Sequence, residues 1–285
     1  MNYILKNSKS INQKLVEKLN IIFKSCIEAF AFPFSIIVLF TDSFDNGVLS
    51  KDTLAVTSKS KKYKIILHTK ILDYVAQKKY DLVDSIIYHE CLHIYDIYSI
   101  RMNTRYNFNP CSSSYKNYAQ FIMNIGFRFW TEFFAYAKTF ECYKEYYNYK
   151  TIYQLAKDYK KIQRKSKSIK LLSERAKQIH TLNDIKDEMK AFIYMLARTA
   201  AGSIFGKQKR YQYSSKTLNS KEYVYVSKGL VTLIKMMKKM VHGTYGKYLY
   251  KRLYSIGLYL LKYFYDSISI TLKKVNNIVY FAYYL

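Results

Sequence analysis

The sequence predicts an α+β protein, with a small mixed sheet in its first half and a mainly helical second half. Three short apolar stretches, at residues 34–40, 54–57 and 63–68, have the length and composition of β-strands. Longer stretches with apolar residues at helical spacing begin at residues 11–31 and recur from residue 81 onward. Strands that come early and are followed mostly by helices are typical of this class.

The first elements follow from spacing and from turn residues. Leu15, Leu19 and Phe23 repeat at helical intervals, and Pro33 is expected to end that helix and admit the first strand. Residues 41–47 contain the Asp, Ser, Asn and Gly of a turn. The sheet is therefore expected to form between residues 34 and 68.

From residue 81 the pattern changes to a helical stripe that includes Leu82, Ile86, His89, His93 and Ile97. The stripe predicts a helix that continues to about residue 100. A polar loop with three consecutive serines separates it from a second helix, over residues 118–147, which is rich in Phe and contains the only Trp. This second helix is apolar enough to pack against the first.

Beyond residue 150 the pattern predicts a charged helix near 151–180, an apolar helix near 185–205 and a Tyr-rich helix near 245–265. The final ten residues fit either a strand or a helix end. We therefore expect two domains, with residues 1–150 forming a catalytic domain and residues 151–285 a basic, mainly helical region.

The four cysteines are widely spaced and form no CxxC pair, so neither a disulfide framework nor a cysteine zinc knuckle is indicated. The N-terminus lacks the apolar core of a signal peptide, and Lys24, Glu28 and Pro33 interrupt the most apolar stretch. We expect no membrane span and a reducing, cytoplasmic location.

The formal net charge of +27 is unevenly distributed. Residues 151–285 contain 27 basic and 7 acidic side chains, against 20 and 13 in residues 1–150. One explanation is an anionic partner, such as nucleic acid, bound by the C-terminal half. The other is the codon bias of an AT-rich genome, which favours Lys, Ile, Tyr and Asn.

Residues 89–93 read His-Glu-Cys-Leu-His, which is the HExxH pattern. Side chains four residues apart on a helix lie one turn apart on one face, so both imidazoles can reach a single tetrahedral zinc ion. Glu90 lies to the side of that face, where its carboxylate can take a proton from a zinc-activated water. We therefore predict His89 and His93 as zinc ligands and Glu90 as the catalytic base.

A catalytic zinc ion usually has three protein ligands and one open position. Glu132 is the predicted third ligand, because it lies on the apolar helix downstream of the motif and is followed one turn later by Ala135, which permits close helix approach. Glu141 and Glu145 are weaker candidates, because they lie where that helix becomes polar.

The combination of His89-Glu90-xx-His93 with Glu132-xx-Ala135 resembles the gluzincin arrangement of zincin metallopeptidases, and its minimal form resembles the ImmA/IrrE-like peptidases. Asp96 is similar to the third position of the HExxHxxD variant of lethal-factor-like and MtfA-like proteins. If this resemblance holds, Asp96 would support the metal site or its helix. The alternative is that Asp96 is an ordinary acidic residue on the helix surface. The resemblance covers about residues 10–150 and implies a small sheet, an HExxH helix and a third-ligand helix.

The expected function is a zinc-dependent endopeptidase that hydrolyses a protein or peptide substrate. In such a site an edge strand beside the cleft can pair with an extended peptide, and Tyr136 or His242 could stabilise the oxyanion. The alternative is a basic protein that binds nucleic acid or a partner and has a structural or vestigial zinc site.

Overall fold

The computed structural model describes most of the chain. Its described residues are 3–6, 12–42, 54–59, 62–104, 117–143, 151–169, 171–205, 221–241, 248–276 and 278–283.

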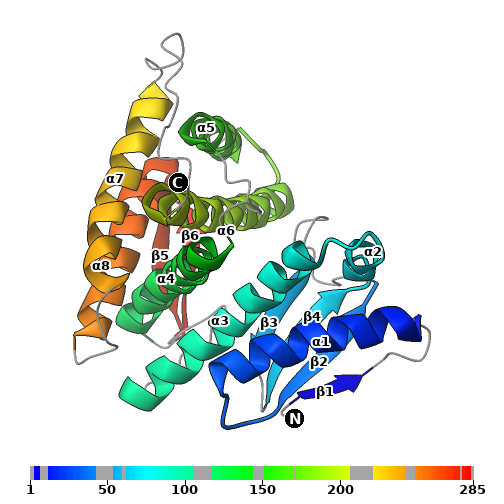
Figure 1. Cartoon of the computed structure of the whole chain (residues 1–285). Coiled ribbons are helices and arrows are strands. Elements are labelled where there is room, and N and C mark those ends of the chain that lie inside the picture. The colour runs from blue at the N-terminus through cyan, green and yellow to red at the C-terminus, as the bar shows by residue number, and fades with distance from the viewer. Residues whose placement is uncertain are drawn as a thin grey trace.

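The first part of the fold is a sheet with helices packed on it (Figure 1). Its elements in chain order are β1 (Tyr3–Lys6), α1 (Gln13–Phe30), β2 (Ile36–Thr41), β3 (Ala55–Lys59), β4 (Tyr63–His68), α2 (Ile71–Ala76), α3 (Tyr80–Thr104) and α4 (Tyr118–Cys142).

The sheet has the strand order β1-β2-β4-β3. The first three of these strands are parallel, and β3 pairs antiparallel with β4 at the edge, with Thr57 opposite Ile65. Tyr63, Ile65 and Leu67 alternate toward the core along β4. The predicted α+β class and mixed sheet are confirmed, although β1 lies in a segment that the pattern did not identify as a strand.

The remaining elements are α5 (Ile152–Ile169), α6 (Arg175–Phe205), α7 (Lys221–Val241), α8 (Leu249–Leu260), a π-helical turn (Leu261–Tyr265), a 3-10 turn (Asp266–Ile268), β5 (Ile270–Val275) and β6 (Ile278–Tyr283). The last two strands form an antiparallel hairpin. The C-terminal region is therefore mainly helical, as expected, but it ends in a hairpin that the sequence left undecided.

Helix α4 joins the two parts, because it packs against α3 on one side and against α6 and α8 on the other (Figure 1). Its crossing with α8 is very close. A Cβ atom added to Gly126 would lie 1.9 Å from the carbonyl oxygen of Leu253, and one added to Gly257 would lie 1.9 Å from that of Ile122. One hydrophobic core runs from α1 to β6 across residue 150, and the division into two domains at that residue stays a prediction.

Candidate metal site

The centre of α3 is buried on several faces, because α1, α2 and β3 contact it on one side and α4 on the other. Val83, Ile87 and Cys91 are fully buried, in addition to the stripe that the sequence indicated. His89, Glu90 and His93 belong to this helix, and only 8%, 7% and 8% of their surfaces are exposed. The motif is therefore part of the interior, and its polar atoms must find partners there.

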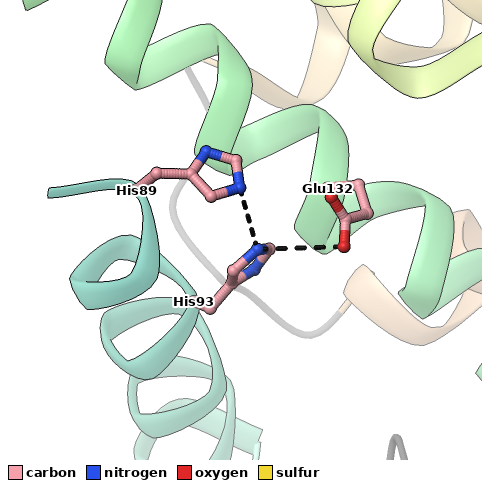
Figure 2. A group of neighbouring side chains, drawn as sticks. All are labelled: His89, His93 and Glu132. Atoms are coloured by element: carbon pink, nitrogen blue, oxygen red, sulfur yellow. Dashed lines mark hydrogen bonds and ion pairs between the residues drawn. The ribbon is translucent and has the colours of Figure 1, made fainter. Parts of the chain in front are cut away.

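Three of the predicted site residues converge where α3 meets α4. The Nε2 atoms of His89 and His93 lie 3.1 Å apart, and Oε1 of Glu132 lies 3.8 Å from Nε2 of His93. The nearest ligand atoms of all three residues lie within 4.8 Å of one another (Figure 2). His89, His93 and Glu132 thus form a group that could hold a metal ion.

The two imidazole nitrogens are spaced nearly as they would be around a zinc ion, and the Glu132 oxygen, within 4.8 Å of both, lies further out. Two ligands on bonds of about 2.0 to 2.1 Å at a tetrahedral angle lie about 3.3 to 3.4 Å apart. The two Nε2 atoms, at 3.1 Å, are close to that value, and the Glu132 oxygen, at 3.8 Å from His93, is slightly further out. Two imidazoles and a carboxylate are also a donor set that zinc prefers.

The second ring nitrogen of His93, Nδ1, has a hydrogen-bond partner on α4. This atom lies 3.1 Å from Oγ1 of Thr131, the residue before Glu132. When Nδ1 carries the proton and donates to Thr131, the lone pair of Nε2 faces Glu132 and is available to a metal. Nδ1 of His89 is buried and has no hydrogen-bond partner among the described residues.

The charge states of the two imidazoles suit metal binding. Burial lowers the pKa of His93 to about 4. Burial, the neighbouring His93 and Arg198 together lower the pKa of His89 well below its ordinary range. Both imidazoles are therefore neutral at pH 7, which is the form that binds metals.

The carboxyl group of Glu132 responds to burial in the opposite direction. Burial and the nearby Glu90 raise the pKa of Glu132 to about 8, against the opposing effect of Lys190 and Arg198 on α6. A divalent cation between Glu132 and the imidazoles would favour the ionised carboxylate.

Glu90 points toward the sheet side of the site. The hydroxyl of Thr57 on β3 lies 2.8 Å from Oε2 of Glu90 and 3.0 Å from its backbone carbonyl oxygen. Burial raises the pKa of Glu90 to about 7, and the bonds from Thr57 limit that rise. A carboxyl group with a pKa near neutrality can both accept and return a proton.

Tyr136 and Arg198 lie on the side of the site next to His89. The Tyr136 ring lies 4.4 Å, centre to centre, from the imidazole of His89. The guanidinium carbon of Arg198, on α6, lies 5.2 Å from the centre of the Tyr136 ring, which is within the range of a cation–π contact. Tyr136 is therefore beside the predicted ligands, whereas His242, the other oxyanion candidate, lies outside the described residues.

Asp96 is fully buried, so its interpretation as a surface acid is wrong. Its Oδ1 atom accepts a hydrogen bond of 3.1 Å from Nε1 of Trp130 on α4. The rival ligand Glu141 lies away from the site and pairs with Lys138 at 2.9 Å, and Glu145 lies outside the described residues.

Sequence reasoning did not identify Thr57, Thr131 or Arg198. Thr131 could have been suspected, because it directly precedes the predicted ligand on the same helix. Thr57 and Arg198 come from a strand and a helix far from the motif in the chain, and no local pattern marks them.

Comparison with known proteins finds no match for this chain, whether with protein-family models, curated proteins or solved structures. Among the helices in the described part of the chain, none combines the length and apolarity needed to cross a bilayer.

Proposed function

We propose that this protein is a zinc-dependent endopeptidase of the zincin type, with His89, His93 and Glu132 as metal ligands and Glu90 as the general base. The observation that carries the proposal is the convergence of the three ligand atoms within 4.8 Å, from two helices, beside the buried carboxyl group of Glu90, which has a different partner.

The number of ligands favours a catalytic site over a structural one. Structural zinc sites are usually closed by four protein ligands, whereas catalytic sites keep one position open. In the portion of the chain that the structure describes, the group has three members. This count speaks against the alternative of a closed structural site.

The surroundings suit a peptide substrate. A zinc ion bound by this group would supply Lewis acidity. Glu90 would take a proton from the water that attacks the peptide carbonyl carbon and return it to the leaving nitrogen as the C–N bond breaks. Strand β3, at the edge of the described sheet and in contact with α3, could pair with an extended peptide.

The decisive experiment combines metal analysis with a cleavage assay. The purified protein is expected to contain one zinc ion and to cleave casein and a mixed peptide library, with loss of cleavage after chelation and recovery on addition of zinc. The variant Glu90→Gln should keep its zinc and lose cleavage by about 10² to 10⁴-fold, because only the proton acceptor is removed.

His93→Ala is the matched variant that should lose both zinc and activity. The proposal fails if the zinc-loaded protein cleaves no peptide in the library, or if Glu90→Gln cleaves at the parental rate. It also fails if Glu90→Gln loses zinc as completely as His93→Ala.

A further inference from the structure

Among the described residues outside α3, Thr57 makes a side-chain hydrogen bond to Glu90, and it comes from the edge strand of the sheet. Its hydroxyl lies 2.8 Å from Oε2 of Glu90 and 3.0 Å from the backbone oxygen of the same residue. The main chain of Thr57 is held in place by antiparallel pairing with Ile65 of β4. The contact therefore ties a fixed strand to the acid beside the metal ligands.

This contact limits the conformations of Glu90. A glutamate side chain has three rotatable bonds, and its terminal torsion is broad and weakly restrained. Threonine is stiff at χ1 because it is β-branched, so its hydroxyl occupies a defined position. The hydroxyl and the backbone N–H of Thr57 both bond to Glu90, and the carboxylate has further lone pairs that stay available.

We propose that Thr57 is a positioning residue that holds the Glu90 carboxylate in the orientation needed to accept a proton beside the metal site. The inference rests on the proposed function, because it assigns the proton acceptor to Glu90. Thr57 acts through Glu90, the residue to which its hydroxyl bonds.

The test uses a probe that does not depend on knowing the substrate. Acetohydroxamate is a small zinc chelator whose hydroxyl proton passes to a nearby base when it binds, so its affinity for the zinc-loaded full chain reports on the position of Glu90. Calorimetric titration is compared for the parent, Thr57→Val, Thr57→Ser and Glu90→Gln. Zinc affinity by chelator competition and thermal unfolding are measured for each variant.

Thr57→Val keeps the size of the side chain and removes the hydroxyl donor, while the backbone N–H that also bonds to Glu90 stays. It should leave zinc affinity within about twofold of the parent and weaken acetohydroxamate binding by about 10-fold, as expected for loss of an outer-shell partner. Thr57→Ser keeps the hydroxyl and should restore binding. Thr232→Val on α7, which removes a threonine hydroxyl remote from α3, is the matched control and should bind as the parent does.

A double-mutant cycle separates positioning from a general structural effect. In the Glu90→Gln background, Thr57→Val should cost much less than it does alone, because both changes act through the same carboxylate. On any substrate that the parent cleaves, Thr57→Val should lower kcat by about 10 to 100-fold and leave KM nearly unchanged.

The inference is overturned if Thr57→Val binds acetohydroxamate as the parent does, or if its effect is equally large in the Glu90→Gln background. These results leave the proposed function intact. Absence of zinc or acetohydroxamate binding in the parent itself would instead overturn the proposed function, and the role of Thr57 with it.

Discussion

Nε1 of Trp130 donates a hydrogen bond of 3.1 Å to Oδ1 of Asp96, and both side chains are buried between α3 and α4. The contact lies three residues after His93 and two residues before Glu132. Removing either partner of a buried hydrogen bond leaves the other without a partner, which costs free energy. The contact therefore ties α3 to α4 next to the predicted metal ligands.

Trp130→Phe should lower the free energy of unfolding by about 2 to 4 kcal/mol, because it removes both the donor and part of a buried ring. Urea unfolding measures this, with Tyr248→Phe at an exposed position as the control. The cost of Trp130→Phe should shrink in an Asp96→Ala background, because the acceptor of the bond is already absent there. Equal costs in both backgrounds would show that the bond contributes nothing to stability.

Thr131→Val should weaken zinc binding by about 10 to 100-fold, the usual effect of removing the partner of a ligating histidine. The reason is that Nδ1 of His93, 3.1 Å from the Thr131 hydroxyl, would lose the acceptor that orients the ring. Chelator competition measures the affinity. Thr131→Ser should bind zinc nearly as the parent does. If Thr131→Ser and Thr131→Val have the same zinc affinity, the hydroxyl does not orient His93.

Glu132→Ala should reduce zinc affinity strongly and abolish the increase in thermal stability that zinc gives the parent. For a ligand that binds only the folded state, that increase is about 2.7 kcal/mol when free zinc is at 100 times its dissociation constant. Glu141→Ala is the matched control, because Glu141 lies on the same helix and is paired with Lys138. Retention of full zinc affinity in Glu132→Ala would exclude Glu132 as a ligand.

Gly126→Ala should destabilise the protein by about 3 kcal/mol, because its new methyl group would meet the backbone of α8, which cannot rotate away as a side chain can. Thermal unfolding is the measurement. Ser255→Ala, at an exposed position of α8, should change stability little. If the two variants unfold at the same temperature, the crossing of α4 and α8 is looser than the structure indicates.

The excess of basic residues in the C-terminal half leads to a prediction about polyanions. The full chain should bind heparin at low ionic strength, with an affinity that falls steeply as salt is added. Exchanging the exposed Lys157, Lys161 and Lys167 of α5 for Gln should weaken binding and reduce the dependence on salt. Salt titration of heparin affinity measures both effects.

The control for this experiment is the same number of exchanges on α1, at the exposed Lys14, Lys18 and Lys24. That variant should keep most of its heparin affinity. If the parent does not bind heparin at low salt, or if both triple variants lose affinity equally, the basic charge reflects composition alone.

Much of the fold followed from local patterns. The first helix ends at Phe30, before Pro33, and β4 has the bounds of the strand predicted at residues 63–68. By contrast, β1 is four residues long, too short to show a period, and it exists as a strand through its pairing with β2. The C-terminal hairpin was likewise undecided, because a short apolar segment fits either a helix end or a strand until its partner is known.

At the site, helical spacing alone predicts that His89 and His93 share one face, because four residues make nearly one turn of any helix. Which residues lie against that face depends on how α3 packs with the other elements. Glu132 and Thr131 lie on α4. Thr57 lies on β3, which precedes the motif helix in the chain and packs against it. Helical periodicity depends on near neighbours, whereas these contacts depend on the packing of a whole core around α3, and no short-range pattern records that packing.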